Sequence, residues 1–243
     1  MIVKSPGIVF KGVDFKDSSR IVTIFTKEYG KQAILFKGFK RSKSRFTGVV
    51  DHSCILNLVF FHKTTRSVQT IKETETRHAT LGIRTDFEKL AISMSLIELA
   101  DQVIPENEVN VEFYDFLEKF LVWLNAYQGN AAVLFPYLQL RVAELCGCGL
   151  QTESPPGELK QHLDIVAGTI TPTMSANLCF PLSTNQLCYL HNALSGKSSA
   201  LLKQEISKSE LKTLIYHLDV YLKHHIEGLK SRKSDAVFSQ ILA

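Results

Sequence analysis

Over its first eighty residues the chain alternates short apolar runs with turns that contain glycine, a pattern typical of β-strands. Five such runs are rich in β-branched and aromatic residues, and they predict strands at residues 6–12, 20–26, 31–38, 49–61 and 66–74. Short strands at this density, with glycines at the bends, favour a small closed or partly open barrel over a flat sheet. An OB-fold and an SH3-like barrel both fit the pattern.

Beyond residue 80 the apolar positions repeat with the period of a helix. The sequence Thr85 to Glu88 predicts a capping box, in which a hydroxyl and a glutamate three residues later satisfy free backbone N–H groups. It opens a helix whose predicted buried face is a stripe of apolar side chains. The members of this stripe are Phe87, Leu90, Ala91, Met94, Ile97 and Ala100.

Further helices follow. One is predicted over residues 111–127 and another over residues 130–145, which Pro136 must kink or divide. Residues 150–182 contain Pro155, Pro156, Gly157, Pro172 and Pro181 in no regular pattern, so we expect an irregular segment there. Helices resume near Thr184, and a second capping box at residues 207–210 opens a long helix, with a short tail helix over residues 236–242.

The expected fold class is therefore α+β, with two domains. Residues 1–80 form a five-stranded barrel, and residues 81–243 form an all-α domain with an irregular insertion. With 243 residues and 45% hydrophobic content, the chain can bury one large core or two modest ones. No apolar run approaches the length that spans a bilayer, and residues 1–6 lack the features of a signal peptide. Five cysteines without framework spacing suggest reduced thiols, so we expect a cytoplasmic protein.

Charge divides unevenly between the two predicted domains. The whole chain has a net charge of +4, but residues 1–80 contain fifteen Lys and Arg against six Asp and Glu. Residues 81–243 contain thirteen Lys and Arg against eighteen Asp and Glu. A basic first third followed by an acidic remainder is the asymmetry expected when one domain binds nucleic acid.

The basic charge is concentrated in residues 34–46, ILFKGFKRSKSRF, which contain no acidic residue. Cations neutralise phosphates and release counterions, and phenylalanine offers a face on which an unpaired base can stack. This combination suits single-stranded nucleic acid. The alternative is a solvated hairpin tip with no binding role.

Motifs that would indicate an enzyme do not occur in the sequence. It contains neither GxxxxGK[ST] nor GxGxxG, and Gly196-Lys197-Ser198 lacks the upstream glycine of a phosphate-binding loop. His224 and His225 are adjacent, so they cannot form an i, i+4 metal pair. The acidic residues of the second half are dispersed, as on solvated helix faces, so we predict no catalysis.

A structural zinc site is the remaining possibility for the cysteines. Cys146, Cys148, Cys179 and Cys188 offer four thiolates, but their pairs are separated by one and eight residues. Structural zinc sites usually present CxxC pairs, because two intervening residues let both sulfurs reach one metal ion. We therefore expect free thiols and no cofactor, although the sequence leaves metal binding by these four cysteines open.

Several segments of this sequence, taken in order and spacing, resemble the RecO family of recombination-mediator proteins. They are Gly7 to Lys11, Asp14-Phe15, Ser19 to Thr26, Gly30-Lys31, Lys37-Gly38 and Lys43 to Phe46. Residues 81–86 and 211–231 extend the resemblance over nearly the whole chain, and it is weakest across residues 150–200. The family often has two CxxC pairs in that weak region. This chain has Pro155 to Glu158 in place of the first pair, so zinc is not expected.

The resemblance implies an OB-fold followed by a helical domain, and a role in homologous-recombination repair near the nucleoid. Such proteins bind single- and double-stranded DNA and anneal complementary strands, and with RecR they help to load RecA onto DNA coated by single-strand-binding protein (SSB). Carried over by position, the residues expected at phosphates are Arg20, Lys37, Lys40, Arg41, Lys43 and Arg45. Phe39 is expected to stack on bases or join the barrel core, and for Phe46 we favour the core. A groove for the SSB tail is expected near Tyr137 and Arg141.

Two other functions fit the same residues. One is an OB-fold module that binds RNA, because the sequence does not show whether a 2′-hydroxyl is recognised. The other is a protein-interaction adaptor whose basic loop meets an acidic partner. The sequence leaves open the oligomeric state, the strand preference, any part played by RecF and the surface on which RecR docks.

Overall fold

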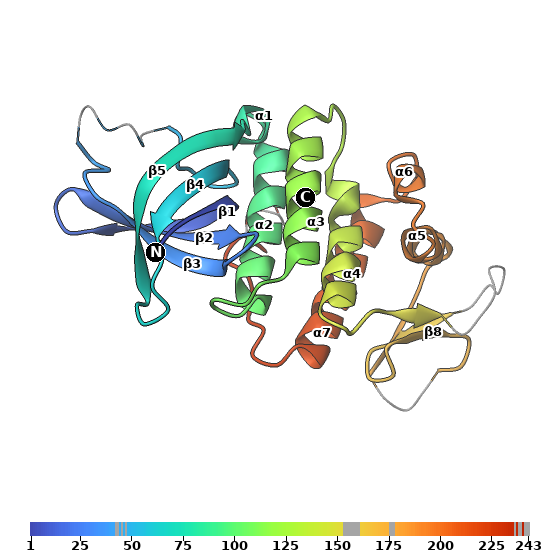
Figure 1. Ribbon diagram of the computed structural model, residues 1–243. Helices are drawn as coiled ribbons and strands as arrows, with labels where there is room; N and C mark the ends of the chain where they lie inside the picture. The colour runs from blue at the N-terminus through green and yellow to red at the C-terminus, as the bar shows by residue number, and fades with distance from the viewer. Residues whose placement is uncertain are drawn as a thin grey trace. The chain divides into compact units, whose positions relative to one another are not determined.

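The computed structural model (Figure 1) describes all residues except 42, 43, 45, 47, 153–160, 175–177, 236, 238, 239 and 241–243. The chain folds into two compact units, residues 1–127 and residues 128–243. Within the described residues, none of the helices is long and apolar enough to cross a lipid bilayer.

The first unit begins with a closed five-stranded barrel (Figure 1). Its strands are β1 (Ile2–Phe15), β2 (Ser19–Thr26), β3 (Gly30–Phe36), β4 (Ile55–Phe61) and β5 (Val68–His78). Their order around the barrel is β1-β2-β3-β5-β4, with β4 returning to β1 and with β3 and β5 parallel. This is the topology of an OB-fold, so the predicted barrel followed by helices is confirmed.

Strands β1 and β4 differ most from their predicted bounds, and β5 runs four residues further than predicted, to His78. Strand β1 is twice the expected length because Ile2 to Ile8 pair with β4 while Gly7 to Phe15 pair with β2, with a register shift between Val9 and Lys11. A bulge of this kind bends the strand and lets it serve both neighbours. Strand β4 begins at Ile55, not near residue 49, because Val49 and Val50 donate their N–H groups to the Phe46 carbonyl in a turn.

The barrel interior is filled by alternate side chains of the strands, as the period of a strand requires. These include Val22, Ile24, Ile34 and Phe36, each at most 1% exposed. Phe46 also belongs to this core, as expected: it is 5% exposed, and its ring lies edge-on to Phe36 at 5.2 Å between centroids.

Three helices complete the first unit: α1 (Leu81–Arg84), α2 (Phe87–Val103) and α3 (Val111–Ala126). The predicted capping box at Thr85 is wrong. Thr85 ends α1, and Asp86 is the N-cap of α2, accepting a hydrogen bond from the Lys89 N–H at 3.1 Å.

The predicted buried face of α2 is only partly right. Ala91, Ile97 and Ala100 are buried, but Phe87 is 58% exposed and Met94 is 37% exposed. The helix contacts both β1 and α3, so it buries side chains on more than one side, including Ile92, Leu96 and Leu99. A single stripe of period 3.6 does not describe such a helix.

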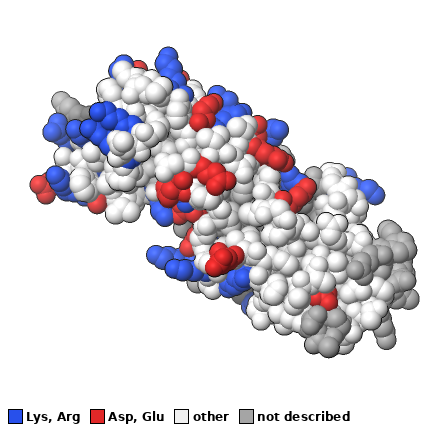
Figure 2. Space-filling model, turned by 60° about the horizontal axis from the view of Figure 1, so that its bottom comes forward, with Lys and Arg blue, Asp and Glu red and all other residues white. Residues whose placement is uncertain are grey.

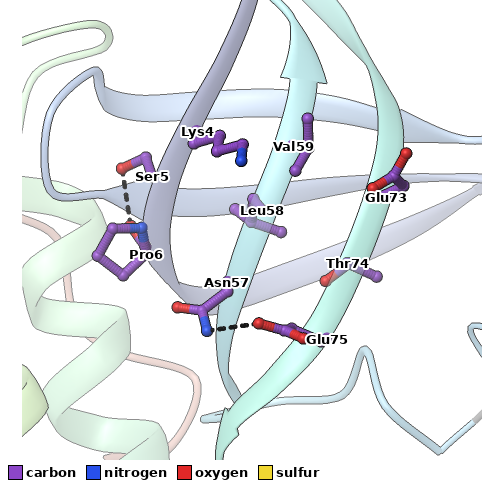
Figure 3. Close-up of a pocket in the computed structure, with 9 residues that line it drawn as sticks. All are labelled: Lys4, Ser5, Pro6, Asn57, Leu58, Val59, Glu73, Thr74 and Glu75. Atoms are coloured by element: carbon purple, nitrogen blue, oxygen red, sulfur yellow. Dashed lines mark hydrogen bonds between the residues drawn. The ribbon is translucent and has the colours of Figure 1, made fainter.

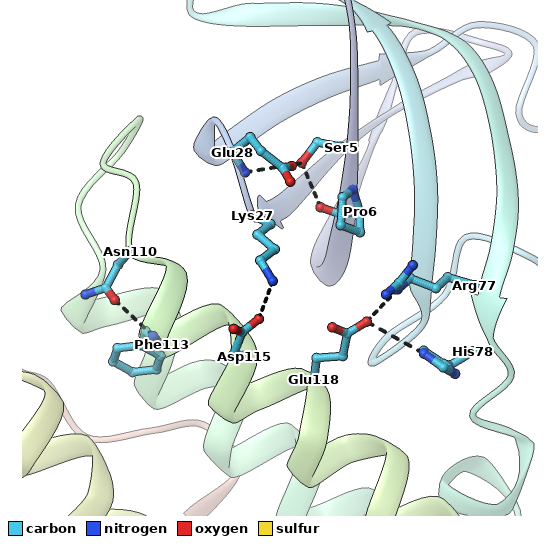
Figure 4. A network of polar contacts seen from close by, with 10 residues as sticks. All are labelled: Ser5, Pro6, Lys27, Glu28, Arg77, His78, Asn110, Phe113, Asp115 and Glu118. Carbon is cyan, nitrogen blue, oxygen red and sulfur yellow. Dashed lines mark hydrogen bonds and ion pairs between the residues drawn. The ribbon is translucent and has the colours of Figure 1, made fainter.

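Ion pairs tie the barrel to α3 (Figure 4). Lys27, beside the β2–β3 turn, lies 2.7 Å from Asp115, and Arg77 of β5 lies 2.7 Å from Glu118. The Asp115 carboxylate raises the pKa of the Lys27 ammonium. These pairs are partly exposed, so they orient the helix more than they stabilise it.

The β2–β3 turn also packs against the connection between α2 and α3. The Lys31 ammonium is almost fully buried, donates to the Asp101 carbonyl at 2.7 Å, and lies 3.3 Å from the Asp101 carboxylate. The Gln32 amide bridges the Tyr29 carbonyl and the Asn107 side chain. A buried cation is tolerated because these oxygens replace its hydration shell.

The second unit is mostly helical. It contains the short 3-10 helix η1 (Ala132–Leu134), then α4 (Phe135–Leu145), α5 (Thr184–Leu194), α6 (Ser198–Leu201) and α7 (Lys208–His225). Pro136 lies in the first turn of α4, so the helix predicted over residues 130–145 is divided there. The capping box at Ser207 and Glu210 is confirmed, and Ser183 and Gln186 form another one that opens α5.

The segment expected to be irregular contains a small sheet. Its strands are β6 (Gln151–Thr152), β7 (His162–Asp164), β8 (Thr169–Thr171) and β9 (Cys179–Pro181), in the order β6-β8-β7-β9. Strands of two or three residues are too short to show an alternating pattern in the sequence. The predicted tail helix over residues 236–242 lies almost entirely outside the described residues.

Candidate nucleic-acid interface

Part of the outer surface of strands β1, β2 and β3 is an exposed patch of mainly apolar side chains, whereas Phe10 and Phe25 of the same strands are buried, with Phe25 against Phe113 and Tyr114 of α3. Register places Val13 beside Ile21 and Ile21 beside Leu35, all pointing away from the barrel core. Val13 is 65% exposed, and Phe15 at the end of β1 is 38% exposed with the Lys16 ammonium 5.4 Å from its ring centroid. Bases can stack on such a face without reference to their sequence.

One end of this face carries the basic loop that follows β3. Lys37 and Arg41 are exposed, and neither takes part in an ion pair with any residue that the structure describes. Lys40 instead lies 2.8 Å from Asp14, and its cation lowers the pKa of that carboxyl group. The Lys40 N–H donates to the Ser18 carbonyl, which joins this loop to the β1–β2 turn.

Arg20 and Phe39 lie together at the same end of the barrel. The Arg20 guanidinium carbon is 5.2 Å from the centroid of the Phe39 ring, and Phe39 is partly buried against the barrel core. Arg20 also donates weakly to the Gly12 carbonyl at 3.4 Å. Both side chains therefore contact the barrel, whereas Lys37 and Arg41 extend into solvent. Lys43 and Arg45 lie outside the described residues.

The opposite end of the barrel carries a second basic segment, the β4–β5 turn with Lys63 and Arg66. Its position follows from His62, whose ring lies 5.0 Å from Tyr29 in the β2–β3 turn. The buried Gln69 side chain accepts from the Lys63 N–H and donates to the Lys63 and Arg66 carbonyls, at 2.8–3.0 Å. These three bonds fix the turn that presents both cations.

Sequence reasoning missed this second segment and the Phe15–Lys16 pair. The residues HKTTRS between two strands, basic and free of acidic residues, are the signal that could have indicated the turn. That Gln69 organises it depends on contacts that no local pattern shows. In the view of Figure 2, Lys and Arg side chains gather on the left, over the barrel.

In the second unit, Tyr137 and Arg141 line the same groove. It has a volume of about 590 Å³ and lies between α4, residues 149–152 and the end of α5. Arg141 forms an ion pair with Glu144, one turn along the helix. The Tyr137 N–H donates to the Tyr189 hydroxyl, which in turn donates to the Val133 carbonyl at 2.5 Å. These bonds hold the groove wall in place.

The cysteines do not gather around a common point in the described part of the chain. All five are free thiols, and no group of three or more His, Cys, Asp or Glu side chains among the described residues is placed to hold a metal ion. Burial raises the pKa of the Cys146 thiol to about 11, and it raises the pKa of Cys148 as well.

Comparison with known proteins assigns the chain to a family. Residues 1–80 match the family model described as Recombination protein O N terminal, and residues 84–235 match the model described as Recombination protein O C terminal. The chain belongs to the RecO family.

Individual relatives support this assignment. A protein named DNA repair protein RecO from Chlorobium phaeobacteroides is 26% identical over the full length of both chains. One from Chloroherpeton thalassium is 25% identical, again over both full lengths. A RecO protein from Salinibacter ruber is 29% identical over 60% of this chain and 56% of its own. The RecO family is thus one of DNA repair and recombination proteins.

Proposed function

We propose that this chain is a DNA-binding recombination mediator in homologous-recombination repair, acting in the cytoplasm at the nucleoid and without catalysing a reaction. It binds single- and double-stranded DNA through the barrel and anneals complementary strands. The observation that supports this most directly is the exposed apolar patch of β1, β2 and β3 beside the exposed cations of the basic loop, Lys37 and Arg41.

The face suits a short stretch of single strand. Strand β3 has seven residues and is about 24 Å long at the usual rise, which suits the few nucleotides that one OB-fold holds. A base would stack on the Phe15 ring, and neighbouring bases would make apolar contacts with Ile21 and Leu35. Phosphates would meet Lys37 and Arg41 at one end of the barrel and Lys63 and Arg66 at the other.

The remaining residues expected from the sequence have supporting roles in this proposal. Arg20 and Phe39 hold the shape of the barrel end, and Lys40 joins the basic loop to Asp14. Lys43 and Arg45 belong to the same basic segment by sequence, so we keep them among the proposed phosphate contacts.

Strand annealing would follow from the screening of phosphate charge by the barrel. Two single strands repel each other through their phosphates, and cations on the barrel lower that repulsion when the strands approach. Because the face recognises stacking surfaces and phosphates, binding is tolerant of sequence and weakens steeply with salt. The step requires neither nucleotide hydrolysis nor a cofactor.

Partner binding belongs to the second unit in this proposal. The groove at Tyr137 and Arg141 would take the C-terminal tail of SSB, with the Arg141 guanidinium meeting a carboxylate. Because Arg141 already pairs with Glu144, an incoming carboxylate must displace that side chain. With RecR, the bound protein would then help to load RecA onto SSB-coated DNA.

The test is binding of a fluorescent oligo-dT to the full chain across a salt series. Two variants remove the proposed contacts, Lys37→Ala/Arg41→Ala and Lys63→Ala/Arg66→Ala. A matched control, Lys203→Ala/Lys212→Ala, removes two exposed cations of the second unit. Each barrel variant should reduce the salt slope by about 1.4, the value for two lost single-strand phosphate contacts. Equal affinities and slopes for all four proteins would refute the assignment.

Two alternative functions are separated by the same assay. If an RNA oligonucleotide of matched sequence competes better than DNA, the chain is an RNA-binding module. If wild-type protein binds neither at moderate salt, the basic loop serves a protein partner, and the chain is an adaptor.

A further inference from the structure

The barrel also has a groove on the side opposite the β2–β3 face. It crosses strands β1, β4 and β5, has a volume of about 610 Å³, and is drawn in Figure 3. In a closed barrel of this strand order, β4 lies across from β2 and β3. The groove is therefore a separate surface from the proposed DNA interface.

Strand register arranges the groove in two rows of outward side chains. One row runs from Lys4 through Val59 to Glu73, and the other from Pro6 through Asn57 to Glu75. The β1 rim is thus basic at Lys4, the β5 rim carries both carboxylates, and the floor between them is largely apolar (Figure 3).

The carboxylate at Glu75 is held by a neutral donor. The Asn57 amide donates to it at 2.9 Å, which orients the group while leaving its negative charge in place. Beside Pro6, the Ser5 hydroxyl donates to Glu28 in the same manner. The carboxylates disfavour phosphates and favour a cationic occupant, for which Glu73 must exchange its exposed ion pair with Lys72, 3.5 Å away.

The form of the occupant follows from the fold. Strand β4 is hydrogen-bonded on both sides, so the groove cannot accept an added strand through its backbone, and recognition must use side chains. The rims are two strand spacings apart, about 9.6 Å, which is narrower than a helix with its side chains. An extended chain fits between them.

The spacing of the two carboxylates matches the spacing of side chains along an extended chain. Glu73 and Glu75 are alternate residues on one face of β5, and alternate residues of an extended chain repeat at the same distance. If alternate residues of the bound segment are Arg or Lys, the aliphatic parts of those side chains would lie on Val59 and Pro6. The Lys4 ammonium would then meet a backbone carbonyl of the segment.

We propose that this groove binds an extended polypeptide segment of a partner protein, with Arg or Lys at alternate positions paired to Glu73 and Glu75. The proposal is independent of the proposed DNA binding, which uses residues of the barrel that do not line this groove.

The test uses two fluorescein-labelled peptides of equal composition and charge, GSGRTRTGSG and GSGRRTTGSG. They differ only in whether the arginines alternate or adjoin. Anisotropy measures their binding to the full chain at low salt, and we expect the alternating peptide to bind several-fold more tightly. Equal affinities for the two peptides, or no binding by either, would overturn the proposal.

Variants locate the site. Glu73→Gln/Glu75→Gln should weaken the alternating peptide by about tenfold, the effect of two partly exposed ion pairs. Val59→Arg, which fills the groove and leaves both carboxylates, should also abolish binding.

The control Glu205→Gln/Glu227→Gln removes two exposed carboxylates of the second unit and should bind the alternating peptide like wild type. Equal losses in this control would mean that only net charge matters. None of these variants should weaken oligo-dT binding, because none removes a cation, and this separates the result from the proposed function.

Discussion

The Arg20 guanidinium lies over the Phe39 ring, with 5.2 Å between the guanidinium carbon and the ring centroid. This contact closes the end of the barrel from which the basic loop departs. Both residues, which the sequence predicts as DNA contacts, therefore also have a packing role at this end of the barrel.

Replacing Phe39 should therefore reduce stability more than DNA affinity. Phe39→Ala removes a partly buried ring and its cation–π contact, and we expect a loss of about 2 kcal/mol in the free energy of unfolding. Urea denaturation measures this loss. Lys37→Ala is the matched control, which should lower oligo-dT affinity and leave the denaturation midpoint unchanged. If Phe39→Ala reduced affinity without reducing stability, the ring would be a stacking surface for bases.

Replacing Gly30 should destabilise the first unit strongly. Gly30 has φ of +67°, and a Cβ there would lie 2.2 Å from the Glu108 carbonyl oxygen. Gly30→Ala must move the β2–β3 turn away from the α2–α3 connection, at a cost of about 3 kcal/mol or more. Thermal denaturation measures the effect. Gly228→Ala, also at positive φ but with no heavy atom within 4 Å of the added Cβ, should cost about 1 kcal/mol. Similar losses in both variants would show that the clash at Gly30 is relieved.

Arg232 should be essential for the stability of the second unit. Its guanidinium is 4% exposed, donates twice to Asp219 at 2.8 Å, and also pairs with Asp235. Arg232→Met leaves the buried Asp219 carboxylate without its cation, and the expected loss is about 3–5 kcal/mol.

Two controls accompany that variant. Burial raises the pKa of Asp219, so the loss in Arg232→Met should shrink as the pH falls and the carboxyl group takes up a proton. The double variant Arg232→Met/Asp219→Asn should recover much of the stability, because no buried charge remains. A double variant as unstable as the single one would show that Arg232 acts through packing on Phe135 instead.

Glu210 should make the stability of the second unit depend on pH in the acidic range. Hydrogen bonds from Ser183, Ser207 and Asn185 lower its pKa to about 2, from an ordinary value of 4.5. Its stabilising contribution is therefore present above about pH 4.5 and is lost as the pH falls toward 2. Glu210→Gln should lower stability by about 1 kcal/mol at pH 7. Thermal melts at pH 7 and pH 3 should show this difference shrinking, whereas Glu205→Gln should match wild type at both.

The sequence predicted the barrel well because the five strands are local runs of β-branched and aromatic residues. It could not predict that Ile2 to Phe15 form one strand, since that depends on two pairing partners and a bulge. On α2 the pattern pointed to Phe87 and Met94, but contacts on two sides of the helix decide which residues are buried.

The candidate site could likewise be predicted only where it depends on local sequence. A basic loop is visible in the sequence, so Lys37 and Arg41 were identified correctly as exposed cations. Whether a cation is free or engaged depends on tertiary neighbours, as Lys40 with Asp14 and Arg20 with Phe39 show. Lys63 and Arg66 were missed because Gln69 organises their turn through bonds within the folded barrel.

The buried ammonium of Lys31 has a consequence for how this protein is made. Its partner Asp101 lies seventy residues later in the chain, and Gln32 depends on Asn107 in the same way. During synthesis on the ribosome, the five strands emerge before the groups that fix the β2–β3 turn. The barrel therefore reaches its final form only after residue 107 has left the exit tunnel. A fragment that ends at residue 80 should accordingly have a less stable barrel, with a disordered β2–β3 turn.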